Sequence, residues 1–233
     1  MNWAVLDATW PAARQWTVGD WTLRHAPGGG SRVNAATPRA DDGATDFEPA
    51  AAAMRQSGQP PLFMIREADM GLDARLQVAG YAIRDPVVIH AAPVATLYAH
   101  RLPDGPVTRH WPPAADQTEI WAGGGIGPDR LAIMDRVGGP KTSLLGRLRN
   151  QPAGCAFVAC HHGSAMLHAL EVRPAQRRQG VARHLVTAAS RWARDQGATD
   201  LTLAVTRANL AACALYASLG MGVVGQYHYR IRT

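Results

Sequence analysis

The sequence predicts an α/β protein of the α+β type, in which helices pack on a mixed central β-sheet. Three observations support this prediction. The last third of the chain alternates strand-like and helix-like segments, 47% of the 233 residues are hydrophobic, and the first half weakly repeats the same order of elements. A chain of this length and composition can bury a core without disulfides or metals.

The last third has the clearest pattern. An apolar run of strand length ends before Pro174, and apolar residues then recur at helical spacing from Val181 onwards. Glycine marks the expected helix ends, and Asn209 is a candidate N-cap. The predicted elements are a strand (165–172), a helix (181–196) before Gly197, a strand (200–206), a helix from Asn209 to Gly220, and a strand (221–231).

Residues 154–160 also have strand character, and the turn at 161–164 joins them to the next strand as a hairpin. Further upstream, the pattern indicates helices over 129–136 and 142–149. The stretch 101–118 is rich in Pro, Asp, Gly and His, and we expect it to be a linker.

The first half of the chain indicates an internal duplication. A helix is expected over 48–56, a strand over 61–66 and a helix over 70–79. The intervals Pro38 to Gly58 (20 residues) and Gly58 to Gly80 (22 residues) resemble those in the last third (23 and 23 residues). We therefore predict a degenerate copy over 1–100, a linker over 101–118 and a second domain over 119–233, with chance likeness of two α/β segments as the alternative.

A glycine turn stands between a predicted strand and helix, at Arg177-x-x-Gly180-x-Ala182. Such a turn directs backbone N–H groups and the positive end of the helix dipole at one point, which suits a pyrophosphate. Gly180 allows close approach of the backbone, and Arg177 and Arg178 add positive charge. Alone, the motif is short and would also fit an ordinary turn.

A second motif follows at the proper distance, formed by Asn209, Ala212, Leu215, Tyr216 and Gly220. With both motifs, the chain resembles the GCN5-related N-acetyltransferase (GNAT) superfamily over about residues 120–233. The usual Phe after the final glycine is replaced by Met221.

The resemblance implies that acetyl-CoA is the co-substrate. It implies that Tyr216 protonates the leaving thiolate, which a phenol with a pKa near 10 can do; the alternative for Tyr216 is a core aromatic. The implied cofactor-binding residues are Leu170, Glu171, Val172, Arg177, Arg178, Gln179, Gly180, Val181, Ala182, Asn209 and Ala212.

The general base is less well specified. Strand alternation places His168 on the face of Leu170 and Val172, and some members of the superfamily carry a His or Glu on this strand. A structural histidine is the alternative. Glu171 is the competing carboxylate, expected on the opposite face, and a water could also carry the proton.

The counterpart of the glycine turn in the first half contains Arg39, Asp41, Asp42 and Gly43. Its spacing is one residue too long, and the two carboxylates would repel a pyrophosphate. We expect this half to have lost cofactor binding and to shape the acceptor pocket.

Other function classes fit less well. The net charge of +6 comes from dispersed arginines, with Lys141 the single lysine, which argues against nucleic-acid binding. The spacings of the nine histidines and three cysteines predict no metal site. No secretory signal or membrane span is expected, and the unpaired cysteine pattern suggests a cytoplasmic protein.

The sequence thus predicts an N-acetyltransferase that moves an acetyl group from acetyl-CoA to a primary amine of a small molecule or peptide, in a direct ternary complex. The alternative is a catalytically weak acyl-CoA-binding sensor or partner subunit. The acceptor is unspecified and the oligomeric state is open, with a homodimer as one option.

Overall fold

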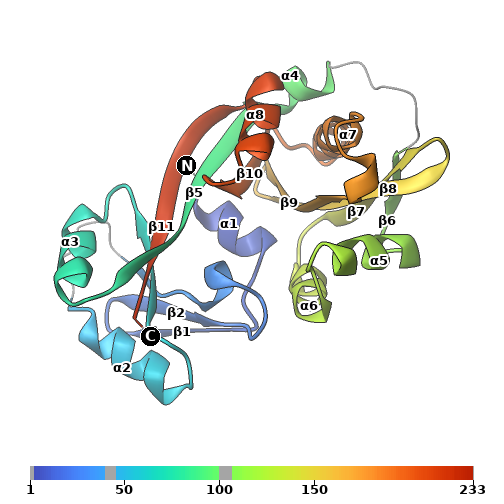
Figure 1. Cartoon of the computed structure of the whole chain (residues 1–233). Coiled ribbons are helices and arrows are strands. Elements are labelled where there is room, and N and C mark those ends of the chain that lie inside the picture. Colours follow the sequence, from blue (N-terminus) through green and yellow to red (C-terminus); the bar gives the residue numbers. More distant parts are fainter. Residues whose placement is uncertain (1–2, 40–45, 100–106, 233) are drawn as a thin grey trace. The chain divides into compact units, whose positions relative to one another are not determined.

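The structure is a computed structural model, and it describes residues 3–39, 46–99 and 107–232 (Figure 1). The chain forms two compact units. The first consists of Met1–Pro11, Ile89–Val205 and Asn209–Val224, and the second of Ala12–Val88, Thr206–Ala208 and Gly225–Thr233. Two long strands, β5 (Ala82–Pro93) and β11 (Gly222–Ile231), have residues in each unit.

The first unit has a mixed sheet, which confirms the predicted fold class. Its strands are β6 (Val107–His110), β7 (Lys141–Leu148), β8 (Gln151–His161), β9 (Ser164–Val172) and β10 (Asp200–Thr206). Their order is β10-β9-β8-β7-β6; β10 pairs with β9 in parallel, and the other neighbours are antiparallel. The helices are α1 (Trp3–Thr9), α4 (Val94–Tyr98), α5 (Ala115–Gly123), α6 (Pro128–Arg136), α7 (Val181–Asp195) and α8 (Leu210–Ser218).

Helices cover both faces of this sheet (Figure 1). On one face, α7 lies so close to β8 that a Cβ added to Gly154 would be 3.0 Å from Val181 Cγ1. On the other face, the Cys155 thiol donates to the Gln117 carbonyl of α5 at 3.7 Å. Because neighbouring residues of β8 face different helix layers, almost the whole strand is buried. Among the described residues, no helix has both the length and the apolar character needed to cross a membrane.

One prediction about this region is wrong. Residues 142–149 were expected to be a helix, but Thr142–Leu148 belong to β7 and pair with β8 on one side. Residues 142–146 are buried without interruption although polar and apolar types are mixed, so the sequence has no strand-like alternation that could separate strand from helix. The described part of the expected linker contains β6 and the start of α5, and residues 101–106 lie outside the described residues.

The remaining elements of the last third are confirmed. The hairpin closes with His161 opposite Ser164, and α7, β10, α8 and β11 lie within two residues of their expected bounds. Asn209 is the N-cap of α8, where its Oδ1 accepts from the Ala212 N–H at 3.1 Å. Local capping chemistry therefore sets the start of this helix.

The second unit combines a small antiparallel sheet with two helices. Its elements are β1 (Arg14–Val18), β2 (Trp21–His25), β3 (Thr37–Pro38), α2 (Glu48–Gln56), β4 (Leu62–Arg66) and α3 (Met70–Val78), with a 3-10 turn at Ser31–Asn34. The helices and β4 confirm the predicted order. Its core contains edge-to-face ring pairs between Trp21 and Phe63 at 5.2 Å and between Phe63 and Tyr81 at 5.6 Å, as aromatic quadrupoles prefer.

The segments β4–α3–β5 and β10–α8–β11 share one local design. Each helix ends at a left-handed glycine, Gly80 (φ 83°) or Gly220 (φ 81°). The next N–H then reaches back to a helix carbonyl, from Tyr81 to Leu76 at 2.9 Å and from Met221 to Tyr216 at 3.1 Å. This likeness supports the predicted duplication and makes Leu76 and Tyr216 equivalent. The full strand order is β4-β11-β5-β10-β9-β8-β7-β6, so the final strand of each repeat is flanked by strands of the other.

A buried ion pair holds the end of β11 to α3 in the second unit. The Arg230 guanidinium donates to Asp73 Oδ1 at 2.7 Å and to Oδ2 at 3.1 Å. His228 Nε2 lies 2.8 Å from Asp73 Oδ1. The hydrogen bond from Arg230, and then that from His228, lowers the pKa of Asp73. A carboxylate with a lowered pKa in the folded state contributes stability above its unfolded pKa.

We expect Asp73→Asn to lower the free energy of unfolding by about 3 kcal/mol at neutral pH, since it leaves the Arg230 charge buried and unpaired. The difference from wild type should shrink as the pH falls below about 4. Asp73 of the unfolded chain is protonated there before Asp73 of the folded protein, and the stability that the lowered pKa provides is lost. Urea unfolding from pH 7 to pH 3 measures both quantities. Glu48→Gln, which removes the exposed pair with Arg55, is the control and should cost under about 1 kcal/mol. Equal losses in the two variants would contradict this assignment.

Candidate active site

The strands β9 and β10 are paired over only part of their length. Parallel pairing runs from Ser164 opposite Asp200 to Leu167 opposite Leu203, whereas β9 continues to Val172 and β10 to Thr206. Beyond Leu167, the backbone of β9 on this edge has no β10 partner in that register. Main-chain N–H and C=O groups require partners, so this opening between two strands suits a ligand with amide groups.

A β-bulge interrupts β9 at the same place. Phe157 faces His168 and Cys155 faces Glu171, so the single residue between them on β8 opposes two residues on β9. One of the two, Ala169, has a φ of 49°, which is unusual for a residue with a side chain. The Trp121 indole of α5 donates to the Ala169 carbonyl at 2.7 Å. The bulge is therefore anchored by a buried tryptophan.

The bulge reverses the predicted facing of the side chains. Paired residues share a sheet face, and Phe157 and Cys155 are two residues apart on β8, so His168 and Glu171 lie on the same face. Val172 pairs with Gly154 and faces α7 instead. The prediction that His168 shares a face with Val172, opposite Glu171, is wrong because strand alternation does not continue through an extra residue.

His168 is enclosed by the N-terminal segment. Its exposed fraction is 7%, and its ring stacks on Trp10 with centroids 4.9 Å apart. The Thr9 hydroxyl donates to the Val5 carbonyl at 2.6 Å, so it accepts from the His168 Nε2–H at 2.9 Å. These contacts support the alternative that His168 is a structural histidine, held through Nε2. Its role as a base remains a prediction.

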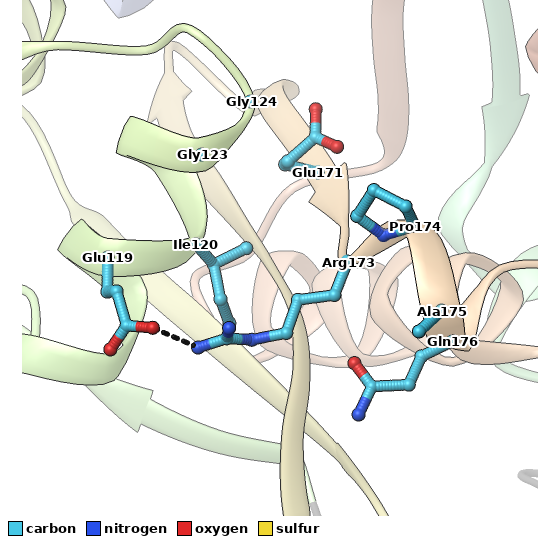
Figure 2. Close-up of a pocket in the computed structure, with 9 residues that line it drawn as sticks. All are labelled: Glu119, Ile120, Gly123, Gly124, Glu171, Arg173, Pro174, Ala175 and Gln176. Carbon is cyan, nitrogen blue, oxygen red and sulfur yellow. Dashed lines mark hydrogen bonds and ion pairs between the residues drawn. The ribbon is translucent and has the colours of Figure 1, made fainter.

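Glu171 lies in a pocket of about 370 Å³ (Figure 2). Its carboxylate rests on Gly124, where an added Cβ would be 2.6 Å from Glu171 Cδ. It also pairs with Arg177 at 3.1 Å, and across the pocket Glu119 pairs with Arg173 at 2.9 Å. The pocket is lined by Glu119, Ile120, Gly123, Gly124, Glu171, Arg173, Pro174, Ala175 and Gln176. Of the two candidate bases, Glu171 is the one that reaches this pocket.

The predicted phosphate turn leads into α7 as expected. Gly180 has φ 85° and ψ −5°, a left-handed conformation, and it is the N-cap of the helix. The first helical hydrogen bond joins the His184 N–H to the Gly180 carbonyl at 3.0 Å. The N–H groups of residues 181–183 precede that bond, so they point out of the helix end, where an anion can accept from them.

The arginines of this turn differ in their contacts. Arg177 is directed back along β9, where its Nε donates to the Val172 carbonyl at 3.1 Å and its guanidinium pairs with Glu171. Arg178 is exposed and has a left-handed φ of 64°. Gln179 is also exposed and donates to the Ala175 carbonyl at 3.2 Å. Arg177 therefore connects the turn to the bulged strand, and Arg178 is an exposed residue of the same turn.

Tyr216 lies in the hydrophobic core cluster that also contains Val172 and Val181, with Leu170, Ala182 and Ala212 packed against it. Burial, with a contribution from Cys213, raises the pKa of Tyr216 to about 12. The cluster thus brings together the candidate acid and the apolar members of the candidate cofactor site. Asn209 uses its Oδ1 to cap α8.

Several residues of the site had no signal in the sequence. Trp121 anchors the bulge, Thr9 and Trp10 enclose His168, and His90 places its ring 5.6 Å from the ring of Tyr216. Each comes from a segment distant in the chain. In the part of the chain that the structure describes, no group of three or more His, Cys, Asp or Glu side chains could hold a metal ion.

Comparison with known proteins gives a consistent result. Residues 97–221, just over half of the chain, match the profile of the acetyltransferase (GNAT) family. A protein of Bacillus subtilis (strain 168), described as the uncharacterized N-acetyltransferase YobR, is 27% identical over 236 residues, which cover 97% of this chain and 95% of that protein.

Two solved structures share the fold over nearly the whole chain. A GCN5-related N-acetyltransferase from Kribbella flavida has a TM-score of 0.72 at 20% identity, covering 98% of this chain and 93% of that one. A functionally unknown conserved protein from Staphylococcus epidermidis ATCC 12228 has a TM-score of 0.72 at 11% identity, covering 97% and 96%. At these identities the likeness is one of fold.

Two glycines that touch Glu171 should respond differently to alanine. A Cβ on Gly154 would lie 2.7 Å from the Glu171 carbonyl oxygen, which is backbone, so Gly154→Ala should cost about 1–3 kcal/mol of unfolding free energy. The three atoms nearest to a Cβ on Gly124 all belong to the Glu171 side chain, which can rotate away. Gly124→Ala should therefore keep its stability while moving the carboxylate away from Arg177. Urea unfolding and a crystal structure of the second variant test this; a large stability loss in Gly124→Ala would refute it.

Proposed function

The chain belongs to the GNAT family of acetyltransferases, and we propose that it transfers an acetyl group from acetyl-CoA to a primary amine of a small molecule or peptide. The transfer takes place directly, with both substrates bound. A location in the cytoplasm remains a prediction from the cysteine pattern.

The observation that carries this proposal is the opening between β9 and β10 beside the N-terminus of α7. The free edge of β9 past Leu167 suits the amides of a pantetheine arm, which can pair with backbone as an added strand does. The left-handed Gly180 and the N–H groups that follow it suit a pyrophosphate. Arg178 supplies an exposed positive charge near that point.

The side chains on the two sides of β9 suit the two proton transfers. The attacking amine must lose a proton, and Glu171 presents a carboxylate in the pocket that can accept it, directly or through water. The departing thiolate must gain a proton, and Tyr216 is a phenol whose pKa of about 12 means that it carries its proton at neutral pH. An amine that approaches Glu171 through this pocket would enter beside Gly124, at the end of α5.

Binding is tested by the thermal shift that acetyl-CoA produces. We expect about 5–10 °C for wild type at a concentration far above Kd, and no shift for Gly180→Asp, whose carboxylate would repel the pyrophosphate. Gly180→Asn has the same shape without the charge and should keep part of the shift. Gly197→Asp has a similar φ of 78° at the other end of α7 and should keep all of it. Absence of a shift in wild type, or an equal shift in Gly180→Asp, would refute the site.

Catalysis is tested by CoA release with a panel of amines. Tyr216→Phe should lower kcat by about 10²- to 10⁴-fold while the Kd of acetyl-CoA stays unchanged, because the lost group is the proton donor. Since the pKa of Tyr216 is about 12, its ionisation should cause no loss of activity between about pH 6 and pH 10. Tyr98→Phe, on α4, is the control and should remain active. Tight CoA binding without turnover on any amine would favour the alternative of an acyl-CoA sensor.

A further inference from the structure

The two long strands each bring one buried polar side chain into the unit where the strand ends. β5 enters the first unit at Ile89, and His90 follows; β11 enters the second unit at Gly225 and carries Arg230. His90 is 10 residues after Gly80, and Arg230 is 10 residues after Gly220. Both are 4% exposed. The two side chains therefore occupy equivalent positions in the two repeats.

Arg230 is well supplied with hydrogen-bond partners. Besides Asp73, its guanidinium donates to Gln77 Oε1 at 3.1 Å and to the Tyr81 carbonyl at 3.0 Å. All of these belong to α3 or to its end. Arg230 thus has the contacts expected of a residue that stabilises the fold.

His90 has the opposite environment. Both ring nitrogens are buried, and neither has a hydrogen-bond partner among the residues that the structure describes. Its ring lies against Tyr216 of α8, with centroids 5.6 Å apart and planes inclined by 52°. A buried polar group without a partner lowers stability, so it requires another explanation than packing.

The residue equivalent to Tyr216 in the second unit is different in kind. The position of Tyr216 is taken there by Leu76, which is fully buried and cannot exchange a proton. The pairing of a buried imidazole with a phenol therefore occurs in the first unit, which also contains the glycine turn at Gly180. This correlation links His90 to the chemistry of Tyr216.

We infer that His90 is a positioning residue for Tyr216, and that its ring N–H donates a hydrogen bond to the Tyr216 oxygen, directly or through one water, while Tyr216 gives up its proton. The inference rests on the proposed function. In that step the acyl C–N bond forms as the thioester C–S bond breaks, and the O–H bond of Tyr216 breaks as the S–H bond of CoA forms. The N–H bond of the amine breaks as Glu171 accepts that proton. Glu171 then releases one proton to solvent and Tyr216 takes one up, so the proton count balances.

The physical reason is the cost of a phenolate in this core. Tyr216 lies among apolar side chains, and its burial disfavours the charged form, as the pKa of about 12 indicates. A donor beside the oxygen stabilises the charge where it develops. Among the polar side chains described, His90 is the buried one whose ring lies against Tyr216 and whose donors are uncommitted.

A double-mutant cycle tests the inference. The variants are His90→Leu, His90→Gln, Tyr216→Phe and the combination of His90→Leu with Tyr216→Phe. The readouts are kcat, KM for acetyl-CoA, the Kd of CoA and the melting temperature. CoA release is followed with the best amine of the panel, or with water as acceptor when no amine is turned over. Arg230→Leu is the matched control, because it removes the equivalent side chain of the other repeat.

We expect His90→Leu to lower kcat about 10- to 100-fold with KM and Kd unchanged, the effect of one hydrogen bond to a charged group. His90→Gln, which retains an N–H donor, should recover part of the rate. The double variant should be no slower than Tyr216→Phe alone, because the two residues act as one unit. His90→Leu should melt no lower than wild type, whereas Arg230→Leu should melt lower and show additive effects with Tyr216→Phe.

Three results would each overturn the inference while leaving the proposed function in place. They are a wild-type rate in His90→Leu, additive losses in the double variant, and a loss in kcat matched by a loss of CoA affinity. If wild type binds acetyl-CoA but turns it over with neither amine nor water, the proposed function fails and the inference fails with it.

Discussion

The extra residue in β9 is the constraint on which the site depends. Without it, strand alternation would place Glu171 against α7 and His168 opposite it. The bulge turns the last part of the strand by one position, so that Glu171 faces the pocket beside Gly124 and Val172 packs under α7. The indole of Trp121 satisfies the carbonyl that the bulge exposes, and a core residue thereby maintains the geometry of a polar site.

The end of pairing between β9 and β10 follows from the same feature. A strand whose backbone departs from regular pleating cannot continue a parallel ladder, and the ladder stops at Leu167, directly before the bulge. Arg177 then connects the separated end of β9 to the turn at Gly180, through the Val172 carbonyl and Glu171. The open strand edge, the pocket carboxylate and the helix N-terminus are thus physically joined, which suits the binding of a long, multiply charged ligand.

The two repeats have the same strand–helix–strand frame but use it differently. Each long strand starts in one unit and ends in the other, and each carries a buried polar residue near its end. In the second unit, the polar residue is Arg230, and a carboxylate and two oxygens neutralise and satisfy it. In the first unit, it is His90, which stands next to a phenol and without a partner among the described residues. Arg230 therefore has the contacts of a residue that stabilises the fold, whereas both ring nitrogens of His90 are uncommitted among the described residues.

Features that depend on neighbouring residues could be predicted from the chain itself. The capping of α8 by Asn209, the left-handed Gly180 before α7 and the order of elements after residue 154 all follow from turn, cap and periodicity rules that act over a few residues. The family resemblance rested on the same short motifs. The strand β7 could not be predicted, because its buried stretch mixes polar and apolar residues and shows no alternation that marks a strand. The tertiary structure decided three features of the site: which face Glu171 takes, the enclosure of His168, and the contact of His90 with Tyr216. Each depends on contacts between segments far apart in the chain, which the local sequence does not encode.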